Sequence, residues 1–201
     1  MNKKRIILIS IIAILAITFI SAISSTINWF INTQNNLIYL KEDVKMQEAQ
    51  IQSALQTRVD LIPNLVETVK GHFAHKEDIL IAIAEARSNL TKNMADGNME
   101  QMIEANTALT SSIDNLFLSI NENYPDLSDS KEVTGLRDEL TAAENRLSMA
   151  RQYYNEKVLV YNTAIQKFPD SIIANMNGHT AFPYFEADEN AQKAPVVDFS
   201  K

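Results

Sequence analysis

Cysteine is absent from the 201 residues, and glycine and proline are scarce, with four and five copies. Without cysteine the chain has no disulfide, no thiolate nucleophile, no cysteine-ligated metal site and no lipidated-cysteine anchor. The shortage of glycine and proline favours long helices joined by few loops. No segment of any length alternates apolar and polar residues, as a half-buried strand would. These absences together favour an all-α fold.

Basic residues are also in short supply outside the N-terminus. The whole chain has 18 basic and 25 acidic residues, which gives a net charge of −7. Residues 1–40 contain three basic residues and no acidic one, so the remainder has 15 basic against 25 acidic residues. Nucleic acids and anionic membrane surfaces both require a basic face on their partner. We therefore expect no nucleic acid among the partners.

A long apolar run begins at Ile6 and continues through Ile23 to Trp29 and Phe30. A helix from Ile6 to Trp29 would be about 35 Å long, enough to cross a hydrocarbon core of about 30 Å. Tryptophan and phenylalanine at its end suit the membrane interface. We predict one transmembrane helix over residues 6–31, which makes the lipid bilayer a partner.

The basic N-terminus, residues 1–5, contains Lys3, Lys4 and Arg5, and no charge follows until Lys41. Basic residues before a span stay on the cytoplasmic side. We therefore expect a single-pass protein of a bacterial cytoplasmic (inner) membrane, with its N-terminus inside and its helical domain outside. A cleaved signal peptide is the alternative, because Ala22-Ile23-Ser24 resembles a small-x-small cleavage site. The apolar run passes that site without a break, which favours the anchor.

Apolar residues recur every three or four positions after a polar neck at residues 32–36, as in antiparallel helical bundles. We predict such a bundle over residues 37–176. Its first stripe consists of Leu37, Leu40, Val44, Gln47, Ile51, Ala54, Arg58 and Leu61. A second stripe runs from Met99 to Ile120, and a third from Val133 to Phe168.

Pro63 interrupts the first stripe. Proline removes a backbone donor and disfavours helical geometry at the residue before it. We predict a kink or a short break at this point, with Asp60 capping the helix that restarts.

Polar residues lie around that proline and along one side of the last long helix. Two interpretations remain open: a cleft that binds a ligand or performs acid–base chemistry, and a buried network that fixes the helix register. Charges of both signs at compatible spacing, with no evident pair of nucleophile and base, favour the structural network. Its predicted members are Arg58, Asp60, Asn64, Glu67, Glu144, Arg151, Asn155 and Asn162. We predict no catalytic residue and no cofactor.

His72 and His75, with Glu77 nearby, are the residues closest to a metal-site pattern. A di-iron bundle would need glutamate three residues before histidine on two helices, which this chain lacks. We interpret both as surface histidines and predict no metal site.

The tail, residues 177–201, contains Gly178, Pro183 and Pro195 and should be irregular. It also carries aromatic and aliphatic side chains, so we expect parts of it to dock on the bundle. At the other end of the domain, the helix from Leu37 should extend beyond its shorter partners and leave the stripe over residues 37–51 uncovered. We therefore predict a homo-oligomer packed through residues 37–51 and the transmembrane helix.

Several of these segments, in this order, strongly resemble the LemA family. The resemblance covers roughly residues 30–200. Its segments are Arg58–Lys70 (RVDLIPNLVETVK), Glu85-Ala86-Arg87-Ser88, Tyr124-Pro125-Asp126-Leu127, Glu144-Asn145-Arg146, Arg151-x-x-Tyr154-Asn155, Tyr161-Asn162, Phe168-Pro169, Tyr184-Phe185-Glu186-Ala187 and Ala194-Pro195-x-Val197-x-Phe199.

The resemblance implies a bacterial protein with one N-terminal transmembrane helix and an antiparallel helical bundle. It provides no enzymatic activity to carry over. Family members are discussed beside membrane proteases and envelope proteins, and one branch is associated with membrane-organelle formation.

Three hypotheses for the function follow. The first is a non-catalytic, membrane-anchored scaffold that organises other membrane proteins or membrane structure. The second is a hydrolase or another enzyme that uses the polar residues, and the third is a ligand-binding sensor ectodomain. Replacement of Glu67 or Arg151 separates the first two, because a scaffold would lose melting temperature and an enzyme would lose turnover.

Overall fold

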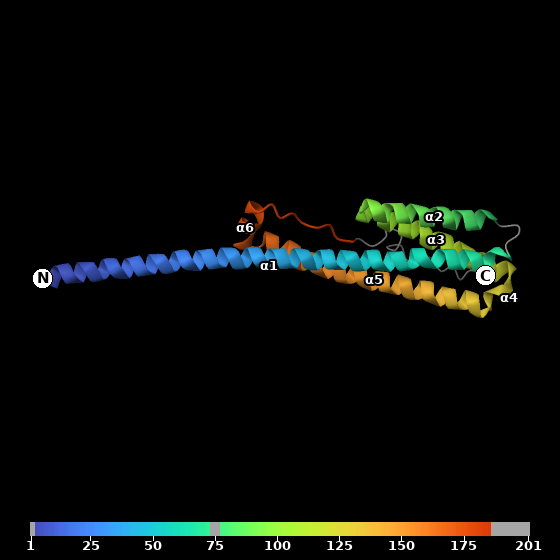
Figure 1. Ribbon diagram of the computed structural model, residues 1–201, viewed down its shortest axis with the longest axis horizontal. Helices are drawn as coiled ribbons and strands as arrows, with labels where there is room; N and C mark the ends of the chain where they lie inside the picture. The colour runs from blue at the N-terminus through green and yellow to red at the C-terminus, as the bar shows by residue number, and fades with distance from the viewer. Residues whose placement is uncertain (1–2, 73–76, 186–201) are drawn as a thin grey trace, which may run out of the picture. The chain divides into compact units, whose positions relative to one another are not determined.

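The computed structural model describes residues 3–72 and 77–185, and within them every regular element is a helix. In chain order these are α1 (Lys3–Lys70), α2 (Glu77–Asp96), α3 (Met99–Asn123), α4 (Pro125–Ser128), α5 (Lys131–Gln166) and α6 (Asp170–Met176) (Figure 1). The chain divides into two compact units. The first unit consists of Met1–Lys45 and Tyr154–Lys201, and the second consists of Met46–Tyr153.

The N-terminal part of α1 is apolar enough to cross a membrane. Among the described residues, an 18-residue window of this helix has a mean hydropathy of 2.0, and none of the window is buried. Its large side chains, such as Leu15 and Phe19, are exposed. A single N-terminal apolar helix of this kind fits a membrane anchor.

In the first unit, the α1 segment after the apolar run packs on the C-terminal half of α5 and on α6. Leu37 and Val44 of α1 are fully buried, as is Val158 of α5. The Lys157 ammonium lies 2.8 Å from the Asp43 carboxylate, and the Thr33 hydroxyl donates to the Asp170 carboxylate over 3.2 Å. The polar neck at residues 32–36 is therefore helical, and its Thr33 is buried.

In the second unit, α2 and α3 form a hairpin beside the C-terminal part of α1 and the N-terminal part of α5 (Figure 1). Gly97 makes the turn with a φ of 69°, a left-handed conformation that other residues adopt only with strain. The Asn98 side chain then caps α3 by accepting from the Gln101 amide over 3.2 Å. The buried apolar side chains follow the three-four stripes on every long helix, among them Leu55, Leu65, Ile83, Leu90, Leu109, Leu116, Leu140 and Leu147.

Two expectations about α1 are wrong. The stripe over residues 37–51 is not uncovered, because Leu37, Val44 and Ile51 are 0%, 0% and 1% exposed within the single chain. Of the kink or short break predicted at Pro63, the break is also absent, because α1 continues through it to Lys70. Asp60 caps no restart and instead accepts from the Gln56 side chain over 2.7 Å.

The helix passes Pro63 because another residue replaces the missing backbone donor. In an α-helix, the N–H of residue 63 would bond to the carbonyl of Val59, and proline has no N–H. The Arg87 Nε atom of α2 donates to that carbonyl over 3.0 Å. Proline at position 63 therefore leaves the Val59 carbonyl of α1 free to accept a hydrogen bond from α2.

We expect Arg87→Met to destabilise the second unit by about 1.5 kcal/mol, because it leaves the carbonyl of the buried Val59 without a donor. Chemical denaturation with a far-UV signal measures the loss. Lys92→Met, an exposed change of equal charge on the same helix, is the control and should stay within about 0.5 kcal/mol. Equal midpoints for the two variants would show that Arg87 does not support the helix at Pro63.

Candidate functional site

The most buried charge of the second unit is Arg58 on α1, which is 3% exposed. Its Nη1 atom lies 2.6 Å from the Glu144 carboxylate of α5 and donates to the Asn106 side chain of α3. Its Nη2 atom donates to the Thr110 hydroxyl over 3.1 Å. One guanidinium thus joins three helices, which suits the planar fork of five donors that arginine presents.

Arg151 on α5 also interacts electrostatically with the Glu144 carboxylate. Burial lowers the pKa of both Arg58 and Arg151, and the charge of Glu144 raises both again. Glu144 itself is 39% exposed, so water also reaches this group of charges. Arginine keeps its proton at any physiological pH, and the group is therefore a fixed charge arrangement rather than an acid–base pair.

Three predicted members of the network lie elsewhere. Asp60, Asn64 and Glu67 are exposed. At 3.6 residues per turn, a continuous helix places Asp60 and Glu67 about 180–200° around α1 from Arg58. Glu67 could share the face of Arg58 only if Pro63 broke the helix and reset the register, and Asp60 could do so only if the helix ended before it.

Asn106 and Thr110 were not predicted, although one signal pointed to Asn106. It occupies an apolar stripe position of α3 and is 2% exposed, and a buried amide requires a partner.

The other two predicted members, Asn155 and Asn162, hold the tail in the first unit. Asn162 accepts from the Phe182 amide over 3.0 Å and donates to the Phe182 carbonyl over 2.9 Å. Asn155 does the same with Phe185, over 2.8 Å and 2.9 Å. Each asparagine thus satisfies both main-chain groups of one tail residue, and we call this pair the asparagine clamp.

The spacing of the clamp matches an extended chain. Asn155 and Asn162 are seven residues apart, so they lie on one face of α5 with a rise of about 10.5 Å between them. Phe182 and Phe185 are three residues apart, which spans about 10 Å in extended backbone. Pro183 falls between the clamped residues, where its missing N–H is not needed, and its carbonyl accepts from the Tyr154 hydroxyl over 3.2 Å.

Aromatic side chains complete the tail contact. The Tyr154 ring meets Phe185 edge-on with centroids 5.1 Å apart, and Tyr161 meets Phe182 at 5.3 Å. The Tyr161 hydroxyl lies 3.0 Å from His179 Nδ1. Burial raises the pKa of Tyr161, while burial and the nearby Lys41 lower the pKa of His179. A neutral imidazole is thus favoured, and its Nδ1 atom can accept a hydrogen bond from the Tyr161 hydroxyl.

We expect Asn162→Ala to release the tail from α5. The change removes two hydrogen bonds at a site that is 6% exposed, for a cost of roughly 2 kcal/mol. Amide hydrogen exchange at Phe182 should then accelerate, while the amides of α2 and α3 keep their protection. Thr163→Ala, an exposed neighbour, is the control. Unchanged protection at Phe182 would contradict a holding role for the clamp.

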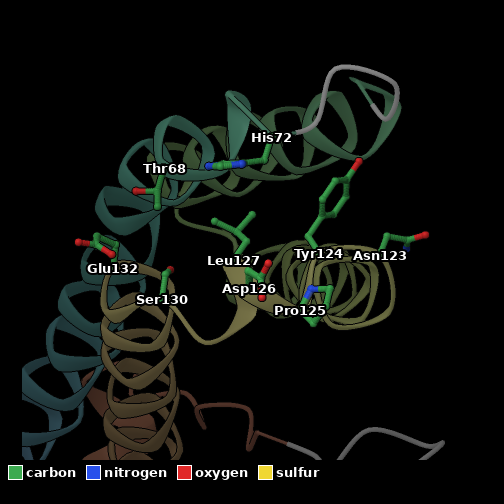
Figure 2. A pocket seen from close by; sticks show the side chains of 9 residues that line it. All are labelled: Thr68, His72, Asn123, Tyr124, Pro125, Asp126, Leu127, Ser130 and Glu132. Atoms are coloured by element: carbon green, nitrogen blue, oxygen red, sulfur yellow. The ribbon is translucent and has the colours of Figure 1, made fainter.

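A polar pocket of about 600 Å³ opens in the second unit. Figure 2 shows Thr68 and His72 on one side of it, across from Ser130, Asp126 and Leu127. Its full lining is Thr68, His72, Asn123, Tyr124, Pro125, Asp126, Leu127, Ser130 and Glu132. The volume suits a small ligand, and hydroxyl and carboxylate oxygens dominate its polar groups.

A second hollow of the same unit lies between α1 and α5 and has a volume of about 590 Å³. We call it the methionine groove, because the exposed Met46 and Met149 line it together with the exposed Tyr153. The other lining residues are Gln47, Gln50, Ser53, Ala54, Thr57, Arg146 and Ala150. Small side chains of both helices thus lie between flexible apolar ones.

The remaining predicted residues are placed as follows. Ile23 and Phe30 on α1 are exposed and Trp29 is half-buried, whereas the Ile6 side chain lies outside the described part. His72 is exposed, and His75 also lies outside the described residues. Among the side chains that the structure describes, no three metal-ligating residues come together.

Comparison with known proteins gives a match over most of the helical domain. The model of the LemA family matches residues 47–199, which is more than half of the chain. The chain belongs to the LemA family. It is also similar to the magnetosome protein MamQ of Magnetospirillum gryphiswaldense, at 22% identity over 206 residues, covering 91% of this chain and 75% of the relative.

The structure gives the LemA-like segments of this chain a physical role. Arg58–Lys70 meets the segment of Glu85 to Ser88 through the Arg87 bond to the Val59 carbonyl. The segments around Glu144 and Asn155 supply the partner of Arg58 and half of the asparagine clamp. Within the described residues, these segments therefore hold helices and tail together.

Proposed function

We propose that this LemA-family chain is a membrane-anchored, non-catalytic scaffold that organises other membrane proteins or membrane structure in a bacterial envelope. The apolar N-terminal helix supports the anchor, and the similarity to a magnetosome protein supports a role at membranes. Several polar residues that an enzyme could have used are engaged in helix and tail contacts, as Arg58 and Asn162 illustrate.

The observation that carries the scaffold role is the methionine groove. Met46, Met149 and Tyr153 are 50%, 51% and 54% exposed, which is unusual for large apolar side chains gathered in one hollow. Flexible methionine side chains adapt to different apolar partners. Two packed helices with small residues between them can receive the apolar face of a third helix. We infer a helix of another membrane protein as the occupant.

Site-specific photo-crosslinking in native membranes tests this role. A crosslinker at Met149 should capture a discrete set of membrane proteins, and one at Thr107, exposed on α3, should not. Met46→Glu, added to the chain that carries the crosslinker at Met149, should abolish the captured set without lowering the melting temperature, because the Met46 side chain is 50% exposed. Identical products at the two positions, or no product at Met149, would contradict the scaffold proposal.

The topology in this proposal is an uncleaved anchor in the cytoplasmic membrane, with the N-terminus inside and the domain outside. The basic residues before Ile6 support the orientation, and the apolar run that passes Ser24 without a break supports an uncleaved anchor. External protease should digest the domain in intact cells, or in spheroplasts where an outer membrane is present. A protected domain, or a mature N-terminus near Ser25, would contradict this topology.

We propose that the chain self-associates through its transmembrane helix alone. The stripe over residues 37–51 is buried within the single chain and therefore offers no surface to a second copy. Sizing of the protein in nanodiscs tests it. A strict monomer at high concentration would refute self-association and would leave the scaffold role intact.

A ligand-binding sensor is the second candidate function, and the pocket in Figure 2 is the observation that favours it. Native mass spectrometry of the protein from its own membranes would detect a retained small molecule. Loss of that molecule in Asp126→Asn, with retention in the exposed control Asp138→Asn, would assign it to the pocket.

A further inference from the structure

The turn from α5 into α6 exposes three large apolar side chains. Phe168 is 77% exposed, Met176 is 70% exposed and Ile172 is 49% exposed. They are spaced four residues apart, so Ile172 and Met176 lie on one face of α6. The other face of the helix packs inward, because Ile173 and Ala174 are each 1% exposed. We call Phe168, Ile172 and Met176 the corner patch.

Contacts within the first unit locate this corner along α1. The Lys157–Asp43 ion pair aligns α5 with α1, and the Thr33–Asp170 bond lies ten residues closer to the apolar run. Ten helical residues correspond to a rise of about 15 Å. The C-terminal half of α5 thus runs toward the apolar segment, and α6 lies beside α1 (Figure 1), with its Asp170 bonded to Thr33.

Thr33 is one helical turn, about 6 Å, beyond Trp29. Trp29 and Phe30 mark the end of the proposed span, where aromatic side chains occupy the membrane interface. The corner patch therefore lies at the depth where headgroups meet acyl chains, which is also where short amphipathic helices bind. Lys167, exposed beside the patch, can direct its ammonium toward lipid phosphates while its stem covers apolar surface.

We propose that the corner patch inserts into the bilayer interface and gives the protein a second membrane contact beside its span. The occupant is the lipid surface, because the patch is adjacent to a helix segment that itself requires lipid. A small patch suffices, because the span already holds the chain at the membrane. Insertion of the patch is then an intramolecular step, which costs less translational and rotational entropy than binding from solution. This inference rests on the proposed anchor.

Tryptophan fluorescence in nanodiscs with brominated acyl chains tests the contact on the full chain. Trp29 is the only tryptophan, so the wild-type protein reports the end of the span. Three probes are built on Trp29→Phe, with Ile172→Trp and Met176→Trp in the corner patch and Tyr39→Trp outside it. Tyr39 is 66% exposed on α1, about 15 Å beyond Trp29.

We expect bromine to quench the indoles of Ile172→Trp and Met176→Trp at least twofold, nearly as much as it quenches Trp29, with blue-shifted emission. The indole of Tyr39→Trp should emit as in water and stay unquenched. A quenched Trp29 with unquenched patch probes would refute the second contact and leave the anchor intact. Blue-shifted but unquenched patch probes would refute it in favour of a protein neighbour. An unquenched Trp29 would refute the anchor itself.

Discussion

Replacing Ile51 by aspartate is expected to unfold the second unit. Ile51 is 1% exposed on α1, so the change removes a buried side chain and places a carboxylate in an apolar core. The combined cost exceeds about 5 kcal/mol, which is comparable with the whole stability of an average domain, about 5–15 kcal/mol. Circular dichroism of the purified protein should show lost helix and no cooperative melting transition.

Gln50→Asp provides the matched control, because it places the same charge one residue away at an exposed position. It should melt within a few degrees of the parent. A folded Ile51→Asp protein with an altered oligomeric size would instead mean that residue 51 lies in an interface between copies. That result would support the homo-oligomer packed through residues 37–51.

Arg58→Ala is expected to produce the other large effect, a loss of about 3 kcal/mol of unfolding free energy. The substitution leaves the buried Asn106 amide and the Thr110 hydroxyl without their donor and deprives Glu144 of its ion pair. The exposure of Glu144 lowers the cost below that of a fully buried pair. Urea denaturation monitored by circular dichroism measures the change.

Two further variants distinguish the reasons for that loss. Arg58→Lys keeps the charge but loses the fork, so we expect it to fall between alanine and the parent. Asp60→Ala, on the exposed face, should stay within about 0.5 kcal/mol. An intact Arg58→Ala fold that has lost a measurable turnover would support the enzyme hypothesis and contradict the structural role.

The sequence predicted the helices because their apolar spacing depends only on the helical period. Leu140, Leu147, Tyr154, Val158 and Tyr161 are stripe positions of α5, and all five are buried. Pro63 was misjudged because the donor that compensates for it, Arg87, comes from another helix. No local pattern around residue 63 carries that information.

The polar positions were predictable where one helix sets their geometry. Glu144, Arg151, Asn155 and Asn162 fall within about 40° of one another around α5, and the structure engages all four. Partners on other segments, such as Thr110 and the main chain of Phe182, were not predictable. A segment that hydrogen-bonds through its main chain can do so with almost any side chain, so its sequence does not reveal the contact.

The asparagine clamp has a consequence for how freely the tail can change during evolution. Because Asn155 and Asn162 bind main-chain atoms of residues 182 and 185, other side chains at these two positions would keep the hydrogen bonds and would lose only the ring contacts with Tyr161 and Tyr154. Proline is the exception, since at either position it would delete the amide that the clamp uses. Homologous chains could thus differ in the side chains that this segment exposes and still attach it to α5 through the same main-chain hydrogen bonds.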